Sequence, residues 1–420
     1  MQVSLYKSKV EGRARAPSSK SYTIRGLVCA ALGEGRSEIV YPLISDDTNA
    51  LSTVLGQVGA SIQQQPDLWQ VRGGSFHKPD GDLFCGDSAA TLRFMTALCS
   101  LVPGRCCLTA GPSLSKRPVK PLVKALEQLG VDVSCQDELA PVVVNGGRLK
   151  GGVTEIAGNI SSQFISALLF IAPLAEEGVE IRLTAPLQSK PYILMTMDCL
   201  RRFGVSVTSS PVLDNFRASR QSYRTAQYRV EGDWSSASYL LALGAVCGEV
   251  VVDNLNPQSL QGDKIILDFL RDMGALVDIN DNAIRVRQSE LKAIKADLSD
   301  CIDLLPTMAI LAATASGVSQ FIGINRARLK ESNRVSALRE GLTKMGVEVT
   351  EEKDRLTIVG SKVKGSAVDS RGDHRIAMAL AVLGSAVGKT IINDAECVAK
   401  TFPDFWETLK SIGVKVAANE

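Results

Sequence analysis

One short pattern occurs six times in this chain and constrains its architecture more than any other feature. It reads leucine, two variable residues, an apolar residue, glycine, a small or apolar residue, any residue and then an aliphatic residue. The glycines of the copies lie roughly 70 residues apart, and a period of this size indicates repeated structural units. These glycines are Gly59, Gly130, Gly204, Gly274, Gly346 and Gly413.

Each copy predicts the end of a helix followed by a strand. In Leu126–Val133, for example, the apolar residues before Gly130 have helical spacing, and the residues after it alternate. Glycine can adopt the left-handed conformation that often ends a helix. The chain is therefore predicted to contain six related α/β units, and the first copy, Leu55–Ile62, fits the pattern most loosely.

A short polar motif precedes an apolar run upstream of each glycine and predicts a helix start. Ser, Asp and Asn at such starts accept hydrogen bonds from unpaired backbone N–H groups, and the helix dipole there favours anions. A helix cap is the simpler interpretation of any single motif, but recurrence at equivalent positions favours a shared anion site. The motifs are Pro17–Ser21, Gly86–Ser88, Asn159–Gln163, Gly232–Ser236, Asp303 and Gly372–Arg375.

A polar, basic stretch from Val212 to Arg229 falls between the third and fourth copies and indicates a division into two halves. We expect a first domain of residues 18–230, on the side of one substrate, and a second domain of residues 1–17 plus 231–420. The predicted strand Gln2–Leu5 would belong to the second domain. Two chain crossings of this kind favour closure of the halves around a ligand.

Composition narrows the choice of partners. The 47 Lys and Arg residues nearly balance the 45 Asp and Glu residues, so we expect a small charged ligand and no nucleic acid. With ten scattered cysteines and only His77 and His374, no metal site is expected. We expect a cytoplasmic protein without a membrane span, because Pro306 and a turn interrupt the uncharged stretch Leu304–Asn325.

The segment Lys330–Arg334 is the most suggestive cluster of charge. If it is helical, Lys330 and Arg334 project from one face and Glu331 is turned about 100° away. That arrangement could hold an anion near a carboxylate. The chain has no GxxxxGK[ST], GxGxxG, HExxH or GxSxG motif, so nucleotide hydrolysis, hydride transfer and zinc proteolysis lack support.

The chain resembles the 5-enolpyruvylshikimate-3-phosphate synthase family over essentially its whole length. The resemblance implies a two-domain inside-out α/β barrel of six βαβαββ repeats, three per domain. It also implies transfer of the enolpyruvyl group of phosphoenolpyruvate to the 5-hydroxyl of shikimate 3-phosphate, in aromatic amino-acid biosynthesis, by a monomer with no cofactor. The matching segments, in the family's order, are 17–25, 86–93, 115–118, 161–164 with 189–192, 330–334, 373–375 and 397–405.

The same resemblance implies roles for individual residues. Asp303 would be the general base at the 5-hydroxyl, Glu331 would take part in proton transfer at the enolpyruvyl methylene, and Lys20 would join them as a catalytic residue. The implied shikimate 3-phosphate ligands are Lys20, Ser21, Arg25, Ser161, Ser162, Gln163, Ser189, Asp303 and Lys330. The implied phosphoenolpyruvate ligands are Lys20, Ala89, Arg117, Gln163, Arg334, Arg375 and Lys400.

Two positions depart from the family pattern. Ala89 and Ala90 stand where the family usually has a Gly-Thr pair, and the extra methyl group at Ala89 would crowd the phosphoenolpyruvate pocket. We therefore predict reduced sensitivity to the herbicide glyphosate, and an inhibition constant as low as that of sensitive family members would refute it. Arg326 replaces an Asn that can contact shikimate phosphate in the family, and we assign it no site role.

Three other functions compete with this interpretation. UDP-N-acetylglucosamine enolpyruvyl transferase has a reactive cysteine in the loop equivalent to 110–118, where this chain has none and Pro112 occupies about that place. A non-catalytic phosphometabolite-binding protein of this fold would be expected to have lost Asp303, Glu331 or Lys20. An RNA 3′-phosphate cyclase fits poorly with the near-neutral charge.

Overall fold

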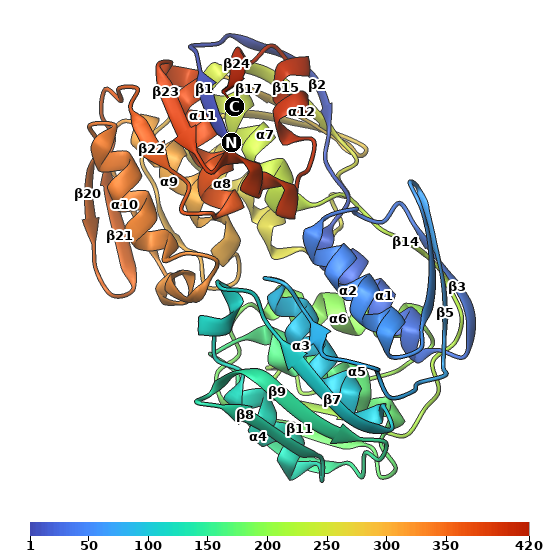
Figure 1. Cartoon of the computed structure of the whole chain (residues 1–420). Coiled ribbons are helices and arrows are strands. Elements are labelled where there is room, and N and C mark those ends of the chain that lie inside the picture. Colours follow the sequence, from blue (N-terminus) through green and yellow to red (C-terminus); the bar gives the residue numbers. More distant parts are fainter. Residues whose placement is uncertain (420) are drawn as a thin grey trace. The chain divides into compact units, whose positions relative to one another are not determined.

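The computed structural model describes residues 1–419, which divide into two compact units (Figure 1). Unit 2 is the continuous segment Ser18–Val230, and unit 1 joins Met1–Pro17 to Glu231–Glu420. Each unit has a hydrophobic core of its own, built from residues of that unit alone.

Every unit contains three four-stranded sheets with one shared topology. In each sheet one edge strand pairs in parallel with its neighbour, and the remaining pairs are antiparallel. In the three sheets whose strands are consecutive in the chain, one helix connects the first two strands and another connects the second to the third. This is the predicted βαβαββ repeat, and the predicted fold class is confirmed.

The sheets of unit 2 have the orders β14-β3-β5-β4, β6-β7-β9-β8 and β10-β11-β13-β12. Their strands are β3 (Gly35–Val40), β4 (Ser61–Gln65), β5 (Leu68–Gly73), β6 (Leu83–Phe84), β7 (Gly104–Thr109), β8 (Asp132–Gln136), β9 (Leu139–Gly146), β10 (Gly152–Ala157), β11 (Val179–Ala185), β12 (Thr208–Ser209), β13 (Asn215–Ala218) and β14 (Gln227–Arg229). Its helices are α1 (Lys20–Leu32), α2 (Asp46–Gln57), α3 (Ala89–Leu98), α4 (Lys120–Gln128), α5 (Ser162–Ile171) and α6 (Lys190–Arg202).

The sheets of unit 1 have the orders β16-β17-β15-β2, β18-β19-β21-β20 and β22-β23-β1-β24. Their strands are β1 (Gln2–Leu5), β2 (Val10–Arg15), β15 (Gly248–Asp253), β16 (Leu276–Asn280), β17 (Ala283–Arg287), β18 (Lys295–Asp297), β19 (Val318–Ile322), β20 (Glu348–Glu351), β21 (Arg355–Val359), β22 (Ala367–Asp369), β23 (Thr390–Asn393) and β24 (Val416–Asn419). Its helices are α7 (Trp234–Cys247), α8 (Ile266–Asp272), α9 (Leu305–Thr314), α10 (Arg334–Lys344), α11 (His374–Val387) and α12 (Phe405–Ser411).

The helices are of two kinds, which explains why the sheets lie outside them. The first helix of each repeat is apolar around most of its circumference, and nearly all residues of α7, α9 and α11 are buried. A helix without a polar face must be covered on every side. These three helices contact one another inside unit 1, and α3 contacts α1 and α5 inside unit 2. The second helix of each repeat, such as α4, is exposed along its polar face.

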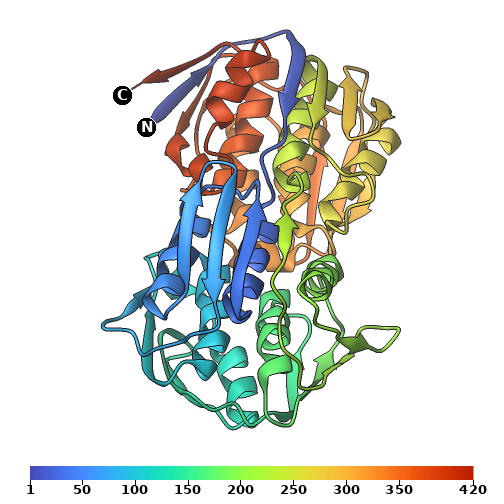
Figure 2. The ribbon, with the colours of Figure 1, turned by 90° about the vertical axis from the view of Figure 1, so that its right-hand side faces the viewer.

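Three repeats share strands with distant parts of the chain. The first sheet of unit 2 is completed by β14, which pairs with β3, and in Figure 2 this yellow-green strand lies beside the blue one. In unit 1, β2 pairs with β15, and β1 lies between β23 and β24. Gln2–Leu5 therefore pairs with strands of unit 1, as its predicted placement in the second half requires.

The six glycines of the repeated pattern all have positive φ, between 79° and 117°. Each lies two residues after the last residue of a helix, so the predicted left-handed helix ends are confirmed. The uncharged stretch 304–325 forms the buried helix α9, a turn and the strand β19, as predicted. Among residues 1–419, no helix is long and apolar enough to cross a membrane.

Candidate active site

Arg334, the first residue of α10, is the centre of a buried charge network in unit 1. Its side chain is 2% exposed. Its Nη1 lies 2.8 Å from Asp303 Oδ1 and its Nη2 lies 2.7 Å from Glu331 Oε2. Its Nε lies 2.8 Å from Asp373 Oδ2, and Nη2 lies 3.3 Å from the other oxygen of that carboxylate. Burial alone would lower the pKa of Arg334, but the three carboxylates outweigh it and raise the pKa.

Asp303 lies in the single 3₁₀ turn Ile302–Leu304 that leads into α9. It does not cap that helix, so the simpler interpretation of this residue as a cap is wrong. Besides Arg334, its carboxylate lies 3.2 Å from Lys330 Nζ and 3.3 Å from Arg375 Nη2. Burial alone would raise the pKa of Asp303, but Arg375, Lys330 and Arg334 together hold it well below its usual range.

The predicted helix over Lys330–Arg334 is not formed, and this expectation is corrected. The 3₁₀ helix Asn325–Leu329 ends at Lys330, which is extended, and Asn333 caps α10 by accepting a hydrogen bond from the Ser336 amide. The intervening residues form a connection between the two helices. As a result Glu331 is not turned away from Arg334 but pairs with it, and its other oxygen lies 3.9 Å from Lys400 Nζ.

Two carboxylates in or beside this network, Asp373 and Asp263, were not predicted as site residues from the sequence. Asp373 is fully buried and caps α11, accepting hydrogen bonds from the Arg375 amide at 3.0 Å and from Ser332 Oγ at 3.1 Å. Its place within the Gly372–Arg375 motif was the available signal. Asp263 lies in none of the sequence motifs. It accepts a hydrogen bond from Ser235 Oγ. Burial and the charge of Asp303 raise its pKa to about 7.

In unit 2, Lys20 stands at the start of α1, where Ser19 caps the helix. Its Nζ lies 2.8 Å from Asp47 Oδ2, and the Asp47 side chain is only 5% exposed. Asp47 lies in the first turn of α2, and its carbonyl oxygen accepts a hydrogen bond from Thr91 Oγ1 of α3 at 3.4 Å. Asp47 thus holds the ammonium group of Lys20 in place and connects α1, α2 and α3. The sequence offered no signal for it beyond an acidic first helical turn.

Arg25 lies one turn further along α1 than Ser21 and is 3% exposed. Its Nε donates to Thr196 Oγ1 at 2.9 Å, its Nη1 to the Ser21 carbonyl at 2.9 Å and its Nη2 to the Tyr192 carbonyl at 3.2 Å. Burial lowers its pKa. Arg25 therefore ties α1 to α6, and of its five N–H donors three serve the protein in these bonds.

A third cation in this unit, Arg93 of α3, was not predicted as a site residue. It donates to Gln163 Oε1 at 2.6 Å and to Ser161 Oγ at 3.2 Å, and its guanidinium lies 4.8 Å from the centre of the Phe164 ring. Ser161 caps α5 by accepting from the Gln163 amide. The structure thus brings the start of α5 to α3. The signal was the position of Arg93 at the end of the 86–93 segment.

The remaining predicted residues of unit 2 lie at or beside helix starts. Ala89 is the first residue of α3 and is buried, Ser162 is the first residue of α5, and Ser189 precedes α6 with φ of 56°. Arg117 is 6% exposed and follows a 3₁₀ turn. Asp87 holds the loop before Arg117 by accepting hydrogen bonds from the amides of residues 113 and 114 at 3.0 and 2.9 Å.

The unit 1 network can exchange its counterions. Four cations, Lys330, Arg334, Arg375 and Lys400, face the carboxylates of Asp303, Glu331 and Asp373. An incoming anion with two or more charges can take over some of these cations, because buried charges interact strongly at short range. The carboxylates it displaces would then bind protons more readily.

The family model described as EPSP synthase (3-phosphoshikimate 1-carboxyvinyltransferase) matches residues 6–409. The chain belongs to the EPSP synthase family. The 3-phosphoshikimate 1-carboxyvinyltransferase of Dehalococcoides mccartyi is 48% identical to it over 99% of both chains. That of Methanothermobacter thermautotrophicus is 43% identical, again over 99% of both chains.

Solved structures agree with this membership of the EPSP synthase family. The EPSP synthase from Acinetobacter baumannii superposes with a TM-score of 0.84 at 25% identity, covering 100% of both chains. The enolpyruvyl transferase NikO from Streptomyces tendae has a TM-score of 0.78 at 16% identity, covering 99% of this chain and 98% of that one. The latter likeness concerns the fold alone.

Proposed function

We propose that this enzyme transfers the enolpyruvyl group of phosphoenolpyruvate to the 5-hydroxyl of shikimate 3-phosphate and releases phosphate. The observation that carries the proposal is the buried network of unit 1, in which four cations are held by three carboxylates. Such a network suits a reaction that needs both positive charge for a phosphorylated substrate and carboxylates for proton transfer. Family membership supplies the two substrates.

The residue assignments follow from this proposal. Arg334, Arg375 and Lys400 of unit 1 would bind phosphoenolpyruvate together with Lys20, Ala89, Arg117 and Gln163 of unit 2. Shikimate 3-phosphate would be bound by Lys20, Ser21, Arg25, Ser161, Ser162, Gln163 and Ser189 of unit 2 and by Asp303 and Lys330 of unit 1. The reaction would thus draw on residues 18–230 and on residues 1–17 with 231–420.

Counterion exchange would prepare Asp303 for its role as a base. Without a ligand, three cations hold the pKa of this carboxyl well below its usual range, so it is a weak base. When the phosphate and carboxylate of phosphoenolpyruvate engage Arg334 and Arg375, Asp303 loses part of that stabilisation and its pKa rises. The base is therefore strengthened when the second substrate is bound.

The bond changes assign a task to each carboxylate. The oxygen of the 5-hydroxyl attacks C2 of phosphoenolpyruvate and gives its proton to Asp303, while C3 gains a proton and becomes a methyl group. The intermediate then loses a proton from C3 and phosphate from C2, which restores the carbon–carbon double bond. Glu331, held 2.7 Å from Arg334, would move the proton at C3. Lys20 would offset the charge of the departing phosphate.

An assay of phosphate release tests the proposal. The full chain is incubated with shikimate 3-phosphate and phosphoenolpyruvate, and UDP-N-acetylglucosamine replaces the first substrate in a parallel reaction. We expect turnover only with shikimate 3-phosphate and a loss of about 10²–10⁴-fold in Asp303→Ala, the range of general acid–base catalysis. Asp272→Ala, on the exposed end of α8, is the matched control. Equal rates in the wild type and Asp303→Ala would refute the assignment.

Three further properties remain proposals from the sequence. They are that the enzyme acts as a monomer without nucleic acid, that it works in the cytoplasm, and that it needs neither a metal nor an organic cofactor. Full activity of chelator-treated protein that sediments as a 44.9 kDa species would support the first and the last.

A further inference from the structure

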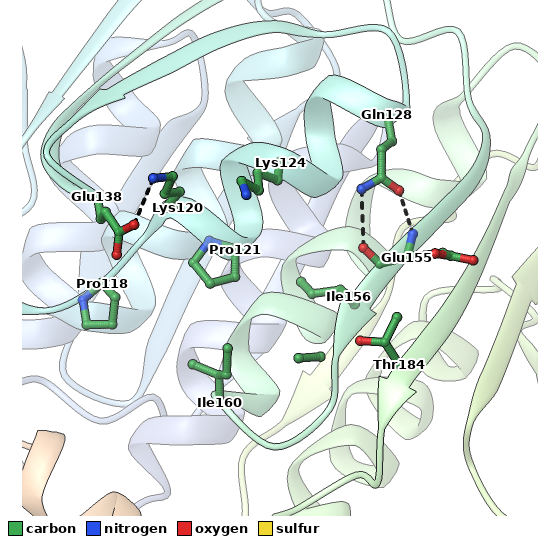
Figure 3. A pocket seen from close by; sticks show the side chains of 11 residues that line it. Pro118, Lys120, Pro121, Lys124, Gln128, Glu138, Glu155, Ile156, Ile160 and Thr184 are labelled. Atoms are coloured by element: carbon green, nitrogen blue, oxygen red, sulfur yellow. Dashed lines mark hydrogen bonds and ion pairs between the residues drawn. The ribbon is translucent and has the colours of Figure 1, made fainter.

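A cavity lies in unit 2, between α4 and the edge strand β10 (Figure 3). The cavity has a volume of about 380 Å³. Lys120, Lys124 and Gln128 line it from one face of α4, because they are spaced four residues apart. Pro118, Pro121, Ala157, Ile156 and Ile160 contribute apolar surface. None of these residues has a role in the proposed reaction.

Gln128 closes one side of this cavity. Its Oε1 accepts a hydrogen bond from the Glu155 amide at 2.6 Å, and its Nε2 donates to the Glu155 carbonyl at 3.3 Å. Figure 3 shows both bonds, which let the Gln128 side chain pair with the outer edge of β10 as a neighbouring strand would. The amide of Gln128 is therefore committed to the protein and leaves ligand recognition to the other lining residues.

The charges around the cavity leave one ammonium group for a ligand. Lys120 Nζ lies 2.7 Å from Glu138 Oε1, so these two charges cancel locally. The charge of Glu155 acts on Arg182 of the adjacent strand β11. Within residues 1–419, Lys124 makes no hydrogen bond or ion pair, and its charge acts at longer range on Glu138.

We propose that this cavity binds a small carboxylic acid with a compact apolar body. The carboxylate would pair with Lys124, and the body would lie against Pro121, Ile156 and Ile160. Ile160 is 36% exposed, so covering it removes apolar surface from water. The single ammonium of Lys124 suits a monoanion, whereas a phosphate dianion would find no guanidinium among the lining residues. The volume lies within the range of small-molecule pockets.

The position of the cavity makes its ligand an effector of the proposed reaction, and this step rests on the proposed function. Pro118 directly follows Arg117, and Ile160 directly precedes Ser161, the cap of α5. A ligand that contacts Pro118 and Ile160 would change the position of Arg117 and of the start of α5. We therefore expect occupancy to change the KM for phosphoenolpyruvate more than kcat.

Calorimetric titration of the full chain with benzoate tests the site without any assay of activity. We expect saturable binding, weakened at least about tenfold in Lys124→Met, which keeps most of the apolar stem. Lys344→Met, an exposed lysine at the end of α10, is the control and should bind benzoate as the wild type does. Benzyl alcohol, which has the ring without the charge, should bind more weakly than benzoate.

Two results would overturn the proposal. One is benzoate binding that is absent or is unchanged in Lys124→Met. The other is tighter, Lys124-dependent binding of inorganic phosphate, which would contradict the carboxylate class. If benzoate binds through Lys124 while the KM for phosphoenolpyruvate stays unchanged, the binding site stands and its coupling to catalysis is refuted. Because binding is measured directly, failure of the proposed function would leave this test intact.

Discussion

Arg334 carries one positive charge but is shared by Asp303, Glu331 and Asp373, so the shape of its side chain matters as much as its charge. The planar guanidinium offers donors in three directions, whereas an ammonium group on a lysine is a single point. The Arg334 side chain is 2% exposed, so water cannot replace a lost partner. Its replacement therefore tests how the network is held together.

We predict that Arg334→Lys lowers kcat/KM for phosphoenolpyruvate by at least about 100-fold and lowers the unfolding temperature. A lysine keeps the positive charge but cannot contact all three carboxylates, and a buried carboxylate left without its partner costs up to about 3–5 kcal/mol. Arg371→Lys is the control, since Arg371 pairs with Glu340 at an exposed position and such pairs contribute little. Steady-state kinetics and thermal melts check both variants, and a wild-type KM in Arg334→Lys would contradict the shared-counterion arrangement.

Asp263 predicts a pH dependence of stability. Burial and the neighbouring charge of Asp303 raise its pKa to about 7, whereas Ser235 and Arg375 act in the opposite direction. An acid whose pKa is raised on folding keeps a proton in the native state that the unfolded chain has lost. Its contribution to stability is therefore present below about pH 4 and is lost as the pH rises toward 7.

Asp263→Asn should remove this loss. We expect its unfolding temperature, relative to the wild type, to increase between pH 5 and pH 8, by an amount that corresponds to a few kcal/mol at most. Asp268→Asn, on the exposed side of α8 and with a side chain 68% exposed, should show no such trend. Thermal melts at several pH values measure it, and a constant difference between Asp263→Asn and the wild type would show that Asp263 does not titrate in this range.

At the level of elements, the glycines that end the helices allow a comparison between equivalent positions. Gly346 and Gly59 both follow a helix and have φ of 85° and 117°. A Cβ atom at Gly346 would meet no atom within 4 Å, whereas at Gly59 it would collide with the carbonyl oxygen of Ser75. Both positions therefore require a backbone with positive φ, but only at Gly59 would a side chain also collide with a neighbouring atom.

We predict that Gly346→Ala costs about 1 kcal/mol, the cost of a left-handed conformation for a residue with a Cβ atom. Gly59→Ala should cost clearly more, because the backbone at Ser75 must also move. Urea unfolding followed by tryptophan fluorescence reports on both, since Trp69 lies in unit 2 and Trp234 in unit 1. Equal costs at the two positions would mean that the collision is relieved without strain.

The sequence predicted elements where local pattern decides the structure and failed where distant contacts decide it. Ser88, Ser161, Asp233 and Asp373 cap helices at the predicted starts, because a cap acts on the next three residues. Lys330–Arg334 was predicted as helix because its charges have helical spacing, but Lys330 is extended and α10 begins only at Arg334. Both of these cations instead pair with Asp303, a distant residue. Arg93 and Asp47 were missed because their partners lie 27 or more residues away.

On the scale of the whole chain, the two units differ in how they depend on chain continuity. All strands of unit 2 come from the continuous segment 18–230, including β14 at its end. Unit 1 takes β1 and β2 from the first 17 residues. Strand β1 lies inside its sheet, and Val3 and Leu5 of that strand are buried. A fragment that starts at residue 231 would therefore leave β23 and β24 without the strand between them.

This difference predicts the behaviour of fragments. Residues 18–230 should fold alone with native-like circular dichroism, and residues 231–420 should not. Gln2 lies opposite Asn419 in the antiparallel pair of β1 and β24, so a short loop can join the two ends of the chain as a hairpin. A permuted fragment, residues 231–420 followed by such a loop and residues 1–17, should then fold cooperatively. If residues 231–420 fold equally well without the added strands, β1 and β2 are not required for the structure of unit 1.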